Sequence, residues 1–281
     1  MKLRVITLSE NIAKSGDILG EAGLSILVET DEMNILLDTG KSISAAHNAR
    51  TLNIDLTKID KIVLSHNHSD HTGGLREILN RIGTKEIEVI AHPDVWAMKY
   101  RGQPPEQVSF TGIPFQRQEL ERCGAVFNLT AKPLRITNNI MTTGEIPLVT
   151  DFETIDQGDT RFIKDGSTYR VDQMLDDQAI IISTEKGLVI VTGCAHRGII
   201  NTLYHAQQLT GINRIYAVIG GSHLKYVPEI RIEQTIAALK ELDIQKLGLC
   251  HCTGLHAIVR IAQELGEKSF FNTAGTCIDL L

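Results

Sequence analysis

Hydrophobic positions along the 281-residue chain follow two spacings, one typical of strands and one typical of helices. Short apolar runs bounded by polar residues or glycine predict strands, as at residues 24–28, 34–37 and 62–64. Apolar residues three and four positions apart predict helices, as at residues 75–82 and 230–242. Strand and helix patterns follow one another in both halves of the chain, so the sequence predicts an α/β fold.

The two halves of the chain resemble each other in the polar residues that follow predicted strands. Asp38 ends one such strand in the first half, and Thr192-Gly193-Cys194 ends a similar one in the second. His66 and His223 occupy corresponding places at later strand ends. Two βαβ-like halves facing each other would give a four-layer αββα sandwich. No linker divides the halves, so residues 1–281 are predicted to form a single domain.

One segment, residues 144–176, interrupts this α/β pattern. It is crowded with charged residues, among them Asp151, Glu153, Asp156 and Asp159, and it has little periodicity. Long irregular segments inside compact domains are usually active-site lids or simply mobile. The segment is therefore predicted to be a lid-like insertion.

Potential metal-binding side chains are most concentrated at residues 66–71, between a predicted strand and a Gly-Gly turn at the start of a predicted helix. His66 and His68 are two positions apart, so both can point the same way from an extended backbone. Asp70 and His71 follow once the chain turns. Four nitrogen and oxygen ligands in two pairs suit two adjacent borderline metal ions, with zinc first. The alternative, a polar loop that is rich in histidine by chance, would leave the flanking strand and turn unexplained.

This His-x-His-x-Asp-His pattern resembles the signature of the metallo-β-lactamase-fold superfamily. A closer resemblance is to the group labelled 7,8-dihydropterin-6-methyl-4-(β-D-ribofuranosyl)aminobenzene-5′-phosphate synthase. Motifs spread over nearly the whole chain carry it: residues 36–40, 66–71, 143–145, 193–196, 220–223 and 251–254. The resemblance implies the four-layer αββα metallo-β-lactamase sandwich and a metal-dependent active site.

The resemblance also suggests further metal ligands, with two departures from the superfamily pattern. Cys194 stands where the superfamily commonly has an aspartate that bridges both metals, and a thiolate is a good zinc ligand. His223 matches the last metal histidine of the superfamily. The usual Gly-His ligand in the middle of the chain is missing, and Glu145, Asp177 or His196 could replace it.

The remaining polar residues are assigned roles around the metals. Asp70 is expected to orient a water molecule, and His196 or His251 is expected to donate a proton or bind a phosphoryl oxygen. Asp38 is expected to accept hydrogen bonds from the motif loop and so fix ligand orientation. Strand alternation points His251 away from the side shared by its two cysteine neighbours, so these three are not expected to hold one ion.

Composition and charge narrow the class of protein. A net charge of −6 argues against a nucleic-acid groove, and no apolar run approaches the roughly 20 residues that span a bilayer. The first residues read as a strand without the apolar core of a signal peptide. The five cysteines are odd in number and unevenly spaced, so a disulfide framework is not expected. These features favour the reducing cytoplasm.

Together these observations predict a metal-dependent hydrolase-type enzyme, or a related transferase, acting on a small molecule. The substrate is expected to carry a phosphate or diphosphate and to be pterin-related, and the cofactor to be one or two zinc ions, with manganese or iron as alternatives. The chain is expected to bind no nucleic acid and no membrane, and a homo-oligomer is compatible with the sequence. The alternative functions are an RNA or DNA phosphodiesterase and a non-catalytic metal or redox sensor built around Cys194.

Overall fold

The computed structural model describes residues 2–155 and 160–281. Asp156 and Asp159 of the predicted lid lie outside the described residues. The chain divides into two compact units that are each built from discontinuous segments of the sequence. The prediction that residues 1–281 act as a single domain stays a prediction.

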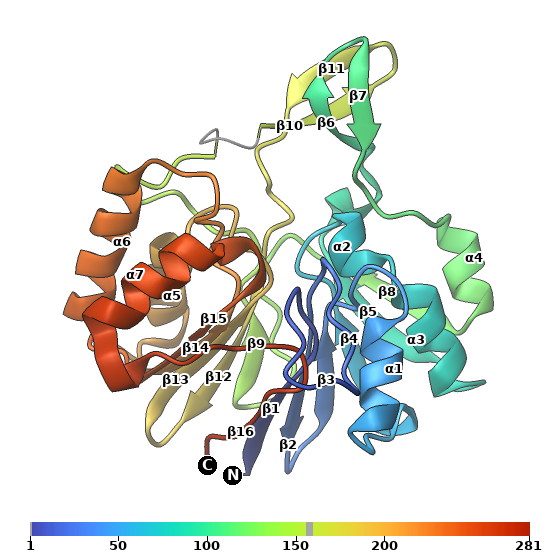
Figure 1. Ribbon diagram of the computed structural model, residues 1–281. Coiled ribbons are helices and arrows are strands. Elements are labelled where there is room, and N and C mark those ends of the chain that lie inside the picture. Colours follow the sequence, from blue (N-terminus) through green and yellow to red (C-terminus); the bar gives the residue numbers. More distant parts are fainter. Residues whose placement is uncertain (1, 156–159) are drawn as a thin grey trace. The chain divides into compact units, whose positions relative to one another are not determined.

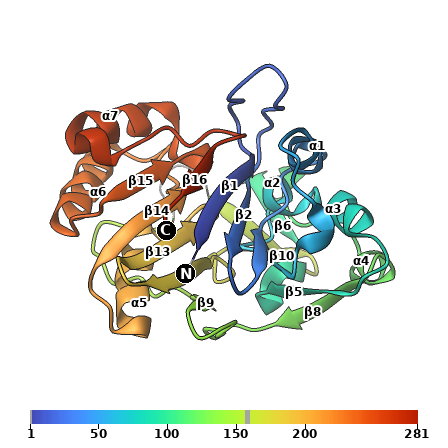
Figure 2. The same cartoon turned by 90° about the horizontal axis from the view of Figure 1, so that it is seen from below.

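The first unit comprises residues 1–96, 111–130 and 273–281. Its centre is a seven-stranded sheet. Strands pair antiparallel from β16 to β3 and parallel from β3 to β8. Figure 2 shows the last strand, β16, beside the first, β1. In sheet order the strands are β16 (Cys277–Asp279), β1 (Leu3–Ser9), β2 (Ser25–Thr30), β3 (Asn34–Leu37), β4 (Lys61–Val63), β5 (Ile87–Ala91) and β8 (Ala125–Leu129).

The helices of this unit pack along its sheet through apolar side chains spaced three and four apart (Figure 1). Leu75, Ile78 and Leu79 are almost completely buried, and burial of each such side chain stabilises the fold by about 1.5–3 kcal/mol. The elements are α1 (Ser44–Thr51), α2 (Ser69–Thr72), α3 (Leu75–Ile82) and α4 (Arg117–Arg122), with short 3₁₀ turns η1 (Leu56–Lys58) and η2 (Pro93–Trp96).

The start of α1 is held by a residue that is distant in the sequence. The helix begins at Ser44, its N-cap residue is Ile43, and no side chain caps it. The Ser42 hydroxyl donates instead to the carboxylate of Glu21, which also accepts from the Ser44 hydroxyl. A carboxylate far away in the sequence has thus taken the place of a local cap.

The second unit contains a five-stranded sheet in which three parallel strands carry most of the apolar residues. The helices α5, α6 and α7 cover this sheet with a single continuous core (Figure 1). In sheet order the strands are β15 (Lys246–Leu249), β14 (Ile215–Gly220), β13 (Gly187–Thr192), β12 (Ala179–Thr184) and β9 (Ile140–Thr142). The helices are α5 (Ile199–Thr210), α6 (Glu229–Glu241) and α7 (Leu255–Leu265), with short 3₁₀ turns η3 (His251–Thr253) and η4 (Gly266–Lys268).

A separate four-stranded antiparallel sheet belongs to the same unit and includes part of the predicted lid. Its strands are β11 (Thr168–Val171), β10 (Arg161–Asp165), β6 (Lys99–Gln103) and β7 (Gln107–Phe110). Residues 144–176 therefore hold two strands, where the sequence predicted irregular structure. Their residues are mostly exposed or half-buried, so no clear alternation of hydrophobic and polar positions marks them.

A buried ion pair anchors this small sheet. Lys99, on β6, is fully buried, and its Nζ atom lies 2.9 Å from Asp172 and 2.5 Å from Asp176. The charges of these aspartates raise the pKa of Lys99 although burial lowers it, so the lysine stays charged in the folded unit.

Candidate metal centre

The histidine motif of the first unit lies on the turn between β4 and α2, as the sequence predicted. The chain leaves the sheet after Val63 and passes through His66 and His68 to the first turn of α2, which contains Asp70 and His71. The three histidines are buried, and Asp70 is half-buried. A buried cluster of imidazoles beside a carboxylate is a donor set suited to zinc and similar divalent ions.

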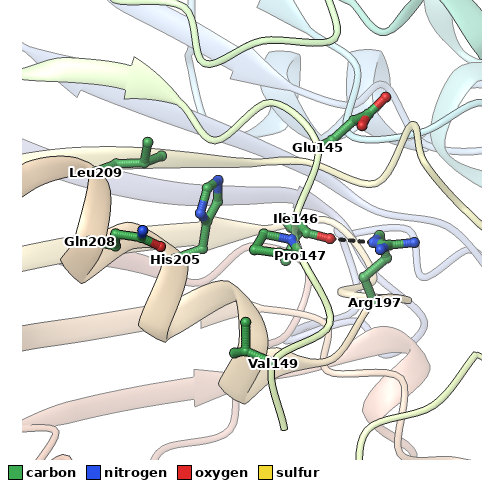
Figure 3. Close-up of a pocket in the computed structure, with 8 residues that line it drawn as sticks. All are labelled: Glu145, Ile146, Pro147, Val149, Arg197, His205, Gln208 and Leu209. Carbon is green, nitrogen blue, oxygen red and sulfur yellow. Dashed lines mark hydrogen bonds between the residues drawn. The ribbon is translucent and has the colours of Figure 1, made fainter.

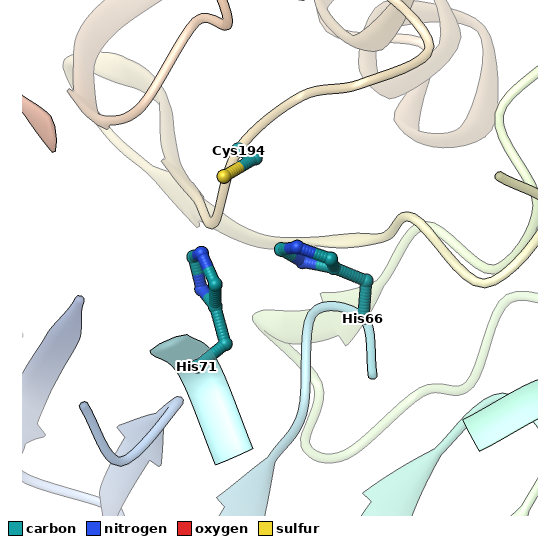
Figure 4. Close-up of side chains that lie close together, drawn as sticks. All are labelled: His66, His71 and Cys194. Carbon is teal, nitrogen blue, oxygen red and sulfur yellow. The ribbon is translucent and has the colours of Figure 1, made fainter. Parts of the chain in front are cut away.

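Side chains of the motif lie close to one another, and their division between two metal ions stays a prediction. His66 Nε2 lies 3.0 Å from His68 Nδ1, and His71 Nε2 lies 4.0 Å from Asp70 Oδ2. The rings of His66 and His71 are only 4.1 Å apart between centroids (Figure 4). Imidazole nitrogens and a carboxylate this close together form a donor set that suits borderline metal ions such as zinc.

Asp38 fixes the orientation of this motif from the end of β3. Its carboxylate accepts hydrogen bonds from the Ser65 amide at 2.7 Å and the Ser65 hydroxyl at 2.6 Å. Its Oδ2 atom also lies 2.7 Å from Nδ1 of His71. The carboxylate therefore holds the proton of His71 on Nδ1, which leaves Nε2 with a lone pair for a metal.

In the second unit, the predicted site residues follow three neighbouring parallel strands. Cys194 and His196 come after β13, His223 after β14, and His251 after β15. The carboxyl ends of parallel strands meet at one edge of a sheet, where open α/β sheets place their ligands. The rings of His196 and His223 are 4.0 Å apart between centroids.

The structure adds Cys252, which sequence reasoning had left out, to this set. One ligand atom each of Cys194, His223 and Cys252 lies within 4.8 Å of the others. Burial by itself raises the pKa of the Cys252 thiol. Hydrogen bonds with Cys194 and His223, together with the charge of His251, have the larger effect and hold this pKa well below its usual value. Cys252 does not continue the strand, because His251–Thr253 forms a 3₁₀ turn. Among the described residues no candidate metal group joins His251 with Cys250 and Cys252, as the sequence predicted.

Strained backbone marks the same strand ends. Residues other than glycine rarely adopt positive φ, yet Asp38, Ala195, His223 and His251 have φ of 57°, 53°, 50° and 55°. Such conformations cost about 1–3 kcal/mol each and concentrate at functional sites. Their recurrence beside the predicted ligands supports a functional role for this edge of each sheet.

The three candidates for the missing mid-chain ligand differ in their surroundings. Among the described residues, neither Glu145 nor Asp177 joins a group of side chains that could hold a metal ion. Asp177 is buried, accepts the Arg197 amide at 3.0 Å, and has its pKa raised to about 7 by burial. His196 lies beside His223 and therefore remains the candidate that best fits a metal-binding role.

Glu145 instead lines an open pocket of about 780 Å³ in the second unit (Figure 3). Arg197 also lines this pocket, and it donates through Nε to the Ile146 carbonyl and through Nη1 to the Gln173 carbonyl at 2.6 Å. Burial lowers the pKa of this guanidinium. The pocket has room for a small molecule, and its lining includes a guanidinium and a carboxylate.

Helices of the described residues are all too short or too polar to cross a membrane.

Comparison with known proteins places these motifs in a family context. Residues 19–195 match the family model of the metallo-β-lactamase superfamily. A Methanocaldococcus jannaschii protein named 7,8-dihydropterin-6-methyl-4-(β-D-ribofuranosyl)-aminobenzene-5′-phosphate synthase is 35% identical over 94% of this chain and 92% of its own length. An uncharacterised protein of the same organism is 32% identical over 86% of this chain and 87% of its own length.

Solved structures give the same result for the fold. A protein described as a metal-dependent hydrolase of the β-lactamase superfamily matches with a TM-score of 0.84 and 29% identity, covering 99% of both chains. The metallo-β-lactamase-fold protein YhfI from Bacillus subtilis matches with a TM-score of 0.58 and 12% identity, again over 99% of both chains. These matches confirm the predicted fold class, the metallo-β-lactamase fold.

Proposed function

The chain belongs to the metallo-β-lactamase superfamily, and from that premise we propose that it is a metal-dependent hydrolase-type enzyme, or a related transferase. Its substrate would be a small molecule that carries a phosphate or diphosphate. The observation that carries this proposal is the convergence of the His66–His68 and Asp70–His71 pairs, with Asp38 holding His71 in the ligating tautomer.

The proposed ligand set follows the order of motifs in the superfamily. His66 and His68 would bind one ion, and Asp70 and His71 the other. Cys194, in the place of the bridging aspartate, and His223 would complete the set. One or two zinc ions suit these donors best. Manganese and iron are alternatives, because carboxylate oxygens also bind manganese and imidazole nitrogens also bind iron.

Bound metal would lower the pKa of water enough to supply a nucleophile near neutral pH and would steady a leaving oxygen. The chain's own residues would do the rest. Asp70, half-buried at the motif, would orient the attacking water. His196 or His251, both buried at strand ends, would donate a proton to the leaving oxygen or bind a phosphoryl oxygen.

The relative from M. jannaschii supports the proposed substrate class. Its name describes a product that contains a pterin and a 5′-phosphate. At 35% identity over nearly the whole chain, a pterin-related, phosphorylated substrate is a reasonable extension. The pocket beside Arg197 would offer such a substrate a cationic group, which suits a phosphate or carboxylate.

Elemental analysis of a His68→Ala variant tests the metal assignment. We expect bound zinc per chain to fall, because His68 supplies one of the two nitrogens of the first pair. His47→Ala is the matched control, since His47 lies on α1 and bonds only weakly to the Asp17 carbonyl at 3.3 Å. Unchanged stoichiometry in His68→Ala would remove the basis of the proposal.

A second pair of variants decides which residue of the second unit completes the set. If Cys194 is a ligand, Cys194→Ala should lose metal and Cys194→Asp should keep it, because a carboxylate restores the superfamily donor. If only His196 binds, His196→Ala should lose metal and Cys194→Ala should retain it.

A panel of phosphate monoesters, phosphodiesters, diphosphates and lactones tests the reaction itself. Turnover of a small phosphate or diphosphate ester that stops with chelator would support the proposal. The second candidate function is a non-catalytic metal or redox sensor, which the grouping of Cys194 with Cys252 favours. Metal-loaded protein that turns over nothing in the panel would support the sensor, and preference for RNA or DNA would support a phosphodiesterase.

A further inference from the structure

Cationic side chains gather at one exposed aromatic ring in the second unit. Tyr226 lies in the loop between β14 and α6 and is 44% exposed. The Lys225 Nζ atom lies 5.0 Å from the centre of its ring, and the Arg101 Cζ atom lies 5.9 Å from the same point. Cations within about 6 Å of a ring centre are attracted by its π electrons. The ring therefore holds together two cations that come from distant parts of the sequence.

The small antiparallel sheet adds a third cation beside these two. Arg101 on β6 lies directly opposite Arg161 on β10, and Figure 1 shows these two strands next to each other. Directly opposite residues of an antiparallel pair share one face of the sheet, and like charges in these positions are destabilising. An anion bound beside both guanidinium groups would offset this repulsion.

Acidic residues close to these cations are engaged by other cations. The Asp172 amide donates to the Arg161 carbonyl at 2.8 Å, but the carboxylate of Asp172 lies 2.9 Å from Lys99 Nζ. Glu229, at the start of α6, forms an ion pair with Arg260. In a chain whose net charge is −6, the cluster is therefore a local excess of positive charge that these two carboxylates do not cancel.

Backbone contacts fix the position of Lys225 within the cluster. Its amide donates to the Cys252 carbonyl at 3.1 Å. Its side-chain stem packs against Gly254, where a Cβ would lie 2.9–3.0 Å from three Lys225 carbon atoms. A cation that is already positioned loses less conformational entropy when it binds a ligand. The same loop contains His223, a proposed metal ligand, two residues before Lys225.

We propose that Arg101, Arg161 and Lys225 bind a phosphoryl group of a small molecule, and that the ring of Tyr226 positions two of these cations. Guanidinium groups match the geometry of phosphate oxygens, and a phosphate monoester carries about −1.5 to −2 charges at pH 7. Three cations suit one or two phosphoryl groups, whereas a nucleic-acid backbone needs a longer basic stripe. The inference deepens the proposed function and rests on it for assigning this phosphoryl group to the substrate.

Inorganic diphosphate titrated into the metal-free full chain tests the site without any turnover. Two-dimensional NMR would follow the amide resonances of Arg101 and Tyr226, so that anions bound elsewhere do not enter the measured affinity. We expect both resonances to shift with one dissociation constant, which should rise with salt concentration. Arg101→Gln and Lys225→Gln should each weaken the affinity about tenfold, because each removes a charge-assisted contact. No shift in the wild type, or unchanged affinity in both variants, would overturn the proposal.

The small sheet supplies a matched control. Lys164 also lies over a tyrosine ring, 5.7 Å from the centre of Tyr169, but it is three residues from Arg161 and so projects from the other face of β10. Lys164→Gln should bind diphosphate as the wild type does. Tyr226→Phe should also keep the affinity and Tyr226→Leu should lower it, because the ring holds the cations. Equal losses in these two variants would contradict the positioning role of the ring.

The outcome of this titration is separate from that of the proposed function. Diphosphate binding at these resonances in a protein without metal-dependent turnover would support the site and count against the enzyme. Turnover of a phosphorylated substrate without these shifts would count against the site alone. If both hold, Lys225→Gln should raise the KM for that substrate more than it lowers kcat. Tighter binding of single-stranded RNA than of diphosphate at the same resonances would overturn the assignment to a small molecule.

Discussion

Replacing Asp38 with asparagine tests how the first unit prepares a metal ligand. Asparagine keeps the size of the side chain and tolerates the positive φ of 57° at this position, so the backbone turn should survive. What changes is the contact with His71 Nδ1, 2.7 Å away. The asparagine NH₂ donates where the carboxylate accepted, so the His71 proton moves to Nε2 and its lone pair is no longer available to metal.

The expected loss is one to two orders of magnitude in metal affinity. Removing an outer partner of a ligating histidine typically costs about 10–100-fold in affinity, which is about 1.4–2.8 kcal/mol. The loss of metal affinity should lie toward the upper end of this range, because Asp38 also accepts hydrogen bonds from the amide and the hydroxyl of Ser65, at 2.7 and 2.6 Å. Those contacts orient the start of the motif as well as His71.

Zinc affinity measured by competition with a chromophoric chelator provides the assay. Asp55→Asn is the matched control, because this exposed aspartate in the same unit only caps η1 through Thr57. Urea unfolding of the metal-free proteins checks that Asp38→Asn is still folded. A folded Asp38→Asn protein with wild-type zinc affinity would refute the argument that Asp38 sets the tautomer of His71.

Three other predictions follow from the second unit. Lys99→Met should lower the free energy of unfolding by about 3–5 kcal/mol in urea titrations, because it leaves Asp172 and Asp176 buried without a cation. Lys240→Met is the control, since the exposed ion pair of Lys240 with Glu264 is worth about 0–1 kcal/mol. Equal effects of the two substitutions would contradict this prediction. Burial raises the folded pKa of Asp177 to about 7 from 3.8, so the folded chain holds this proton more tightly and stability falls as pH rises between those values. Asp177→Asn should therefore exceed the wild type in thermal stability at about pH 8 and lose that advantage at about pH 4; an advantage independent of pH would argue against titration of this group. Limited proteolysis should cut residues 144–176 first in metal-free protein and more slowly with an active-site ligand, and cleavage that no ligand slows would argue against a lid.

The sequence by itself determined the fold class and the metal motif. Three histidines and an aspartate within six residues, placed between an apolar strand and a Gly-Gly turn, are a local pattern, and local patterns survive folding unchanged. The proximity of His66 and His68 agrees with the two-residue repeat of an extended backbone. Helix and strand positions followed from hydrophobic spacing for the same reason, since burial of an apolar face forms most of these elements.

Only the tertiary structure decided the contacts that depend on residues far apart in the sequence. At the start of α1 the Glu21 carboxylate accepts a hydrogen bond from the Ser42 hydroxyl, a contact that no local pattern predicts. The strands β10 and β11 are mostly exposed or half-buried and so carry no hydrophobic pattern. They form because β10 pairs with β6 and β11 pairs with β10, beside the buried ion pair of Lys99.

Cys252 shows the same limit at the site. The sequence placed Cys252 only relative to His251, on the opposite side of a strand. In the structure a 3₁₀ turn that begins at His251, whose φ is positive, brings Cys252 close to Cys194 and His223. That turn is strained, so local preference argues against it, and only the packing of three neighbouring strand ends makes it the stable arrangement.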